Sequence, residues 1–258
     1  MAPPNDSPRR AGLPAAESVL FERTLTPRRP GLAAAEGART YRIIRTAELD
    51  PYEKPISREE LAALTFESIE AAGDDFRGTS RRAAKISIAD ADIEVFDDLS
   101  DLLDSLVAEE DMVDHDPRIT TDRDSDRVEE EIRNVQVRAF LYAASREKDN
   151  DYHLILGRDP ELSPPLYMTM ELSGLPPAGD DSFDTLKAAR DAYKDFFGSD
   201  LPGTSYDFYD PPIPVEIGGS LFFDMSHASG SRPGPQSLRD DMPTIWEVHP
   251  VTEIVFEP

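Results

Sequence analysis

The sequence contains no cysteine, and this absence excludes several kinds of site. None of the 258 residues is a cysteine, so the chain has no disulfide framework, no zinc ribbon and no cysteine nucleophile. A chain without cysteine suits a reducing compartment, and we expect a cytoplasmic location. Glycine is sparse as well, with 14 residues against 23 prolines, and this ratio indicates many loop boundaries.

Long apolar runs are also missing. No run approaches the roughly 18 to 20 residues that a membrane-spanning helix needs, so we expect no membrane partner. The first 30 residues lack the apolar core of a secretory signal peptide, and the spacing of their prolines argues against a long helix. Residues 1–38 are therefore predicted to be a disordered tail rich in Pro and Arg.

Positive charge is scarce outside the N-terminal region. The formal net charge is −25, and residues 1–46 hold eight arginines against four acids, which leaves 19 basic against 48 acidic residues in the rest of the chain. Such a body repels phosphate backbones, because nucleic-acid affinity comes largely from cations that displace counterions. A nucleic-acid partner is disfavoured, and the expected partner is an unidentified protein or small ligand.

Residues 39–128 are predicted to form a small acidic α/β segment that ends in a linker. Thr40–Thr46 favours a strand. Ser57 and Glu60 match a capping box, and the helix that follows is expected to end at Gly73.

The second half of this segment carries most of its acidity. Ala83–Phe96 alternates well enough for one strand or a hairpin, and leucines at helical spacing predict a helix over Leu99–Val107. The acidic face of that helix has two interpretations: a solvated face behind an apolar stripe that packs on the body, or a docking surface for a basic partner.

Residues 129–258 give the clearest pattern. Five stretches favour β-strands, and a stretch with helical spacing lies between the third and the fourth, capped by Asp181 or Ser182 and ended by Gly198. Three strands, a helix and two strands is the element order of the OB-fold. The expected fold class is α+β: a C-terminal five-stranded OB-like β-barrel with one helix, preceded by the small acidic segment and the tail. The predicted strands contain NVQVRAFLYAAS, YHLIL, LYMTMELSGLP, PVEIGGSLFFD and TIWEVHPVTEIVFEP.

Three stretches carry a resemblance to known proteins. The stretches are REKDNDYHLIL, GGSLFFDMSH and WEVHPVTEIVF, and they resemble segments of uncharacterised bacterial proteins with an OB-like, nuclease-like barrel. The resemblance covers roughly residues 132–258 and implies the same fold. It implies no activity, because the Arg and Asp pattern of staphylococcal-type nucleases is not evident.

Three of the four histidines in the chain lie in the predicted barrel, each near an acid. Residues two apart on a strand face the same side, so two of these pairs project together. If the strands converge, the pairs form a His/carboxylate site for a divalent cation. Otherwise they are simple hydrogen bonds on a polar face, and we expect no other cofactor. The candidate metal ligands are Asp151 with His153, Asp224 with His227, and Glu247 with His249.

The sequence assigns no catalytic or ligand-binding residue. General acid–base chemistry by His153 or His249 is open, since histidine is the usual proton carrier near neutral pH. The cluster Tyr206, Phe208 and Tyr209 is expected to be a loop packed over the barrel, with a stacking platform as the alternative. Gly218-Gly219 indicates a bulge.

Two functions from different classes remain open. The first is a non-enzymatic binding or interaction module, with its ligand on the barrel face formed by Tyr152–Leu156 and Tyr167–Leu172. The alternative is a metal-assisted, phosphodiesterase-like hydrolase that uses the His/carboxylate pairs.

Overall fold

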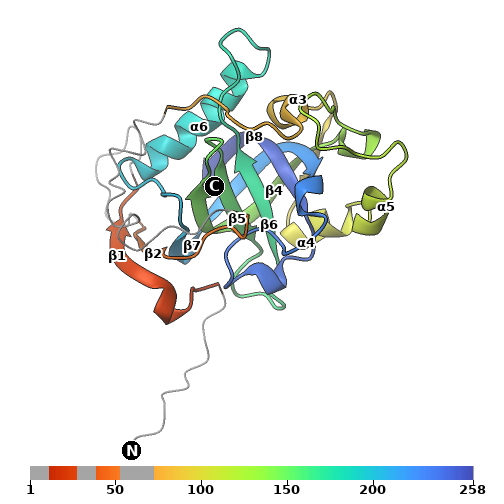
Figure 1. The fold of residues 1–258 in the computed structure, drawn as a ribbon. Coiled ribbons are helices and arrows are strands. Elements are labelled where there is room, and N and C mark those ends of the chain that lie inside the picture. The colour runs from red at the N-terminus through yellow and green to blue at the C-terminus, as the bar shows by residue number, and fades with distance from the viewer. Residues whose placement is uncertain (1–11, 28–38, 53–72, 258) are drawn as a thin grey trace, which may run out of the picture.

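The structure is a computed structural model that describes residues 12–27, 39–52 and 73–257 of the chain. This part is α+β, with one eight-stranded mixed sheet and few helices (Figure 1). The strands are β1 (Val19–Leu25), β2 (Tyr41–Thr46), β3 (Ile93–Phe96), β4 (Asn134–Arg146), β5 (Tyr152–Gly157), β6 (Tyr167–Leu172), β7 (Asp207–Phe223) and β8 (Trp246–Phe256).

The helices are short, apart from one of 15 residues. The α-helices are α3 (Arg82–Ile86), α4 (Leu99–Asp104), α5 (Glu109–Val113) and α6 (Phe183–Phe197). The 3-10 helices are η1 (Ala16–Ser18), η2 (Glu129–Glu131), η3 (Met225–His227) and η4 (Arg239–Asp241). Within the described residues, no helix has the length and apolar character needed to cross a membrane.

The strand order is β1-β2-β7-β8-β6-β5-β4-β3, and β7 also pairs with β4. The pairings β4–β5, β5–β6, β6–β8, β8–β7 and β7–β4 thus form a closed circuit. All of them are antiparallel except β6–β8, and β3 joins the edge of β4 in parallel. The element order predicted for residues 129–258 is confirmed, because α6 lies between β6 and β7.

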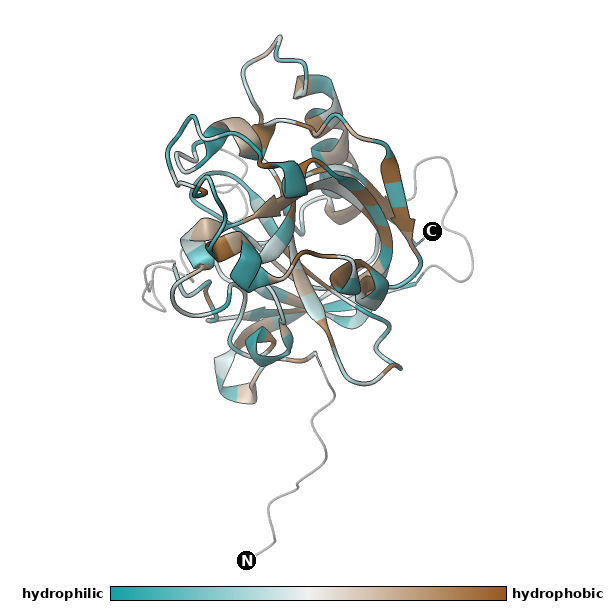
Figure 2. Ribbon diagram, turned by 90° about the vertical axis from the view of Figure 1, so that its right-hand side faces the viewer, coloured by the Kyte–Doolittle hydropathy of each residue, from teal (hydrophilic) through white to brown (hydrophobic). Residues whose placement is uncertain are grey.

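The main core takes alternate residues from these strands, which curve strongly (Figure 2). Every second residue of a strand points to this core, because successive side chains of a strand face opposite ways. Trp246 is 1% exposed and belongs to this core. α6 packs against β8, where Phe196 stacks on Phe256 with ring centroids 3.9 Å apart. The apolar stripe of the predicted helix, now α4, also packs against this core. Whether its acidic face is only solvated or also docks a basic partner stays a prediction.

Several predictions for the N-terminal half need correction. The predicted tail contains the edge strand β1, which pairs antiparallel with β2 over Val19–Leu25 although its residues do not alternate between buried and exposed. Ala83–Phe96 is not one strand or a hairpin: it holds the short helix α3 and the strand β3. The strands β1, β2 and β3, which precede residue 129, share one sheet with the strands of residues 129–258. The sheet therefore shows no boundary at residue 129. The helix expected after Ser57 lies outside the described residues.

The aromatic cluster is another correction. Phe208 and Tyr209 belong to β7 instead of a loop, and together with Tyr206 they are fully buried. They therefore offer no stacking platform. The predicted bulge at Gly218-Gly219 is confirmed, since the register of β7 with β8 shifts there. A Cβ atom on Gly219 would lie 2.2 Å from the Pro250 carbonyl oxygen, which explains the glycine.

Candidate functional site: a buried carboxylate–imidazole cluster

The face of β5, β6 and β8 that points away from the main core carries polar side chains in register. His153 on β5 is the cross-strand partner of Glu171 on β6, and Thr169 on β6 is the partner of Glu247 on β8. His249 follows Glu247 by two residues and shares its face. The same strands send their leucines, methionines and valines to the core on the other side.

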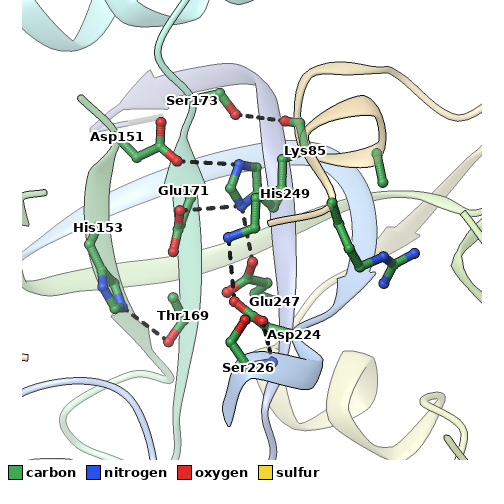
Figure 3. Close-up of polar contacts among 12 residues, drawn as sticks. Lys85, Asp151, His153, Thr169, Glu171, Ser173, Asp224, Ser226, Glu247 and His249 are labelled. Carbon is green, nitrogen blue, oxygen red and sulfur yellow. Dashed lines mark hydrogen bonds and ion pairs between the residues drawn. The ribbon is translucent and has the colours of Figure 1, made fainter. Parts of the chain in front are cut away.

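This polar face is covered instead of solvated. His153, Glu171, Glu247 and His249 are each at most 3% exposed. α3 and the segment that follows β7 lie over them (Figure 3). Burial of this many ionisable groups is costly unless each group has a hydrogen-bond or ion-pair partner. Most of the groups have such partners, but some atoms have none.

We call Asp151, Glu171, Glu247 and His249 the carboxylate–imidazole cluster. His249 is at its centre, with Nδ1 3.0 Å from Glu247 Oε1 and 3.2 Å from Glu171 Oε2, and Nε2 3.5 Å from Asp151 Oδ2. The contact with Glu247 is a hydrogen bond. In contrast, Asp151 Oδ2, Glu171 Oε2 and His249 Nε2 are fully buried and make no hydrogen bond.

These three residues form a group suited to a metal ion. One ligand atom from each of Asp151, Glu171 and His249 lies within 4.8 Å of the others. Asp151 is fixed by its second oxygen, which accepts a hydrogen bond of 2.6 Å from the Gly174 amide. Glu247 holds the His249 ring from the side, as second partners of metal-binding histidines commonly do.

Burial sets the protonation of the cluster. It raises the pKa of Glu171 and of Glu247 to about 8 each, and the mutual repulsion of the carboxylates adds to the effect at Glu171. It also raises the pKa of Asp151 well above its usual value. For His249 burial works in the opposite direction and lowers the pKa to about 3. The imidazole is therefore neutral at pH 7 and keeps a lone pair for a ligand.

Lys85 of α3 supplies the positive charge. Its ammonium nitrogen lies 3.3 Å from Asp224 Oδ2, at the end of β7 (Figure 3). Burial opposes the charge of Lys85, but Asp224, Glu171 and Glu247 outweigh it and raise the pKa well above the usual value. The pKa of Asp224 is lowered by Lys85 and His227 despite its burial. These two residues therefore form an ion pair beside the cluster.

Arg127 positions Lys85 relative to His249. Its guanidinium donates to the backbone carbonyls of Ala84 and Ser87, next to Lys85, and to the carbonyl of His249 at 2.8 Å. It also donates to the Leu221 carbonyl on β7. One half-buried side chain thus ties α3, β7 and β8 together.

His153 belongs to a different group of contacts, which we call the His153 network. Its Nδ1 lies 2.7 Å from Glu147 Oε1 and 4.0 Å from Asp50 Oδ2, and its Nε2 lies 3.3 Å from Thr169 Oγ1. Asp50 Oδ2 also accepts a hydrogen bond from the Gly234 amide. Burial alone would lower the pKa of His153, but Glu147 and the other carboxylates raise it to about 10. Asp50, Glu147 and His153 also bring ligand atoms within 4.8 Å of one another, but a cation there would have to displace the proton that the carboxylates hold on His153.

No family model, curated protein or solved structure matches the chain. The resemblance to OB-like barrel proteins therefore remains a prediction, and function has to be inferred from the site itself.

The six predicted metal ligands do not share one cluster. Asp151, Glu247 and His249 lie together, whereas His153 lies in its own network. His227 contacts Asp224, with 3.6 Å between Nε2 and Oδ2. Neither His227 nor Asp224 belongs to a metal-type group within the described residues.

Two important residues were not among the predicted ligands. Thr169 and Glu171 alternate with Met168, Met170 and Leu172 in β6, and this alternation is a signal that the sequence does contain. Lys85 gave no such signal, because its place in the site depends on the packing of α3 against β8.

Proposed function

We propose that this chain is a binding protein for a divalent cation, built on a five-stranded OB-like barrel, with Asp151, Glu171 and His249 as the ligands. One observation carries the proposal: these residues direct three buried atoms without hydrogen-bond partners toward one another. An unpartnered buried polar atom costs about 1 to 3 kcal/mol. A cation coordinated by all three would remove that cost.

The donor set indicates the class of cation. Two carboxylates and one neutral imidazole suit Zn²⁺, Mn²⁺ or a similar divalent transition metal better than a soft ion such as Cu⁺, which selects thiolate and thioether ligands. Three protein ligands also leave at least one coordination position open for water or a further ligand, as in catalytic zinc sites. Glu247, hydrogen-bonded to Nδ1 of His249, orients the ring.

The barrel part of the proposal is supported by the closed circuit of strand pairings and by the position of α6 between β6 and β7. OB barrels bind ligands on the face of their second and third strands. In this chain those strands are β5 and β6. Asp151 directly precedes β5 and Glu171 lies on β6, which agrees with that location.

Isothermal titration calorimetry of the EDTA-treated, dialysed chain tests the proposal. Titration with Mn²⁺, Zn²⁺, Mg²⁺ and Ca²⁺ should show one ion bound per chain for at least one of them. Glu171→Gln should weaken that binding at least tenfold, since second-sphere changes already cost about 10- to 100-fold. Glu216→Gln, on a partly exposed position of β7, is the matched control and should bind as the unchanged chain does. Absence of binding by all four ions, or equal binding by Glu171→Gln, contradicts the proposal.

A metal-assisted hydrolase is the second candidate, favoured by a cavity of about 340 Å³ that Lys85 and Glu147 line beside the buried groups. A cation with an open position can activate water for hydrolysis. Hydrolysis of bis-p-nitrophenyl phosphate that requires the cation and disappears in Glu171→Gln would establish this activity. If the cation binds without hydrolysis, the binding function stands alone.

A further inference from the structure

The cavity beside the site has several cationic lining residues, although the chain as a whole is strongly acidic. It is formed by residues 77–80, by the turn of residues 147–149 between β4 and β5, and by Lys85. Three of its eight lining residues are cationic, namely Arg77, Lys85 and Lys148, in a chain whose net charge is −25. Thr79 and Ser80 add two hydroxyl groups.

The negative charges of this cavity are partly matched. Glu147 lies 2.7 Å from the ring of His153. Asp149 accepts a hydrogen bond from the Asp151 amide at 3.3 Å. Guanidinium and ammonium groups recognise phosphate and carboxylate oxygens through charge-assisted hydrogen bonds, and hydroxyl groups donate to the same oxygens.

Lys85 connects the cavity to the carboxylate–imidazole cluster. Its side chain lines the cavity, and its ammonium pairs with Asp224 at 3.3 Å within the buried group that contains Glu171 and Glu247. A ligand in the cavity would therefore contact Lys85, which Figure 3 shows beside His249, Glu247 and Asp224.

We propose that this cavity binds a small oxyanion, a phosphate or carboxylate group, through Arg77, Lys85 and Lys148. The oxyanion site stands without the proposed function; only its position beside a bound cation, across Lys85, rests on that function. The volume of about 340 Å³ is at the lower end of small-molecule sites, which span about 300 to 1,000 Å³. The lining has no large apolar side chain, so the ligand is small and polar.

Calorimetry on the full chain tests the oxyanion site with inorganic phosphate in one series and acetate in another. Each series is run with metal-free protein and again with saturating Mg²⁺ or with whichever tested cation binds. Arg77→Gln and Lys148→Gln, both at exposed positions, should each weaken binding of the preferred anion about tenfold. Arg138→Gln, a 66% exposed side chain on β4 that does not line the cavity, is the matched control and should leave it unchanged.

The outcomes separate the two proposals. Binding of neither anion by the unchanged chain, or equal binding by Arg77→Gln, Lys148→Gln and Arg138→Gln, overturns the oxyanion site whether or not the cation binds. Anion binding that depends on Arg77 and Lys148 in a chain that binds no cation supports the oxyanion site and removes the cation site. A preference for phosphate over acetate, or the reverse, shows whether the site selects phosphate or carboxylate groups.

Discussion

Arg81 and Arg133 each form a two-point ion pair with a glutamate, but in different surroundings. Arg81 pairs with Glu131 through two contacts of 2.7 Å, and both side chains are at most 1% exposed. Arg133 pairs with Glu94 at the same distances, but these side chains are 21% and 45% exposed. Removal of one partner leaves an unpaired buried charge only in the first pair.

Glu131→Gln should therefore lower the free energy of unfolding by about 3 kcal/mol or more. The glutamate also accepts hydrogen bonds from the backbone amides of Val128 and Phe223, so its loss affects β7 as well. Glu94→Gln is the matched control and should cost less than about 1 kcal/mol. Urea denaturation of the three chains measures both values, and similar values for the two variants would show that burial does not decide the difference.

The close packing of Gly219 leads to a second prediction for a single residue. Its backbone approaches Pro250 and Val251 of β8 so closely that an added Cβ would lie 2.2 Å from the Pro250 carbonyl oxygen and 2.9 Å from Val251 Cα. Gly219→Ala should therefore destabilise the fold by about 1 to 3 kcal/mol through overpacking. Gly218→Ala, whose nearest neighbour would be 3.0 Å away, should cost less. Thermal unfolding followed by circular dichroism ranks the two variants, and the reverse ranking would contradict this steric explanation.

At the scale of secondary-structure elements, Asp74 holds the helix α6 in place through two ion pairs. The carboxylate accepts a hydrogen bond of 2.9 Å from Arg190 and another from Lys194, both on α6. Burial opposes ionisation of Asp74, but these two cations lower its pKa from 3.8 to about 2. Because the pKa is lower in the folded state, the ion pairs stabilise the protein above about pH 4 and this contribution is lost as the pH falls toward 2.

Asp74→Asn should thus lower the free energy of unfolding by about 1 kcal/mol at pH 7, after allowance for partial exposure of the pair. The difference from the unchanged chain should narrow between pH 4 and pH 2. Urea denaturation at pH 7, 4 and 3 measures it. A constant difference across this range would show that Asp74 acts by packing instead of charge.

Sequence patterns predicted the elements of residues 129–258 well because each depends on local periodicity. Alternation marks β4, β5, β6 and β8, and the end of α6 at Gly198 follows from its φ of 58°. The patterns failed where tertiary packing outweighs local preference. The loop predicted around Phe208 and Tyr209 is instead part of β7. Residues 207–213 contain two prolines, yet they extend the strand because pairing with β2 and β4 stabilises them there.

The candidate site was predictable only in part for the same reason. The sequence shows Asp151 and Glu247 close to histidines. However, Asp151 lies 98 residues and Glu171 lies 78 residues before His249, and only the strand register brings them together. The sequence indicates a polar face on these strands but gives no sign of its burial. This face is buried because α3 and the segment after β7 cover it, and no local pattern signals such a cover.

At the scale of the whole molecule, the proposed cation joins strands that are distant in sequence. Asp151 directly precedes β5, Glu171 lies on β6 and His249 on β8, so coordination cross-links three strands of the closed circuit. A ligand that binds only the folded state at a free concentration of 100 times its Kd adds about 2.7 kcal/mol to the free energy of unfolding. The gain is expected across the whole cooperative unit, since these strands share one core.

The cation that binds in calorimetry should therefore raise the melting temperature by several degrees, at about 2 to 4 °C per kcal/mol for a chain of this size. NaCl at equal ionic strength controls for screening of the −25 net charge. EDTA should reverse the shift, and Glu171→Gln should abolish it while Glu216→Gln keeps it. A shift of equal size in Glu171→Gln would place the ion elsewhere on this acidic surface, because that variant lacks one of the three buried ligands.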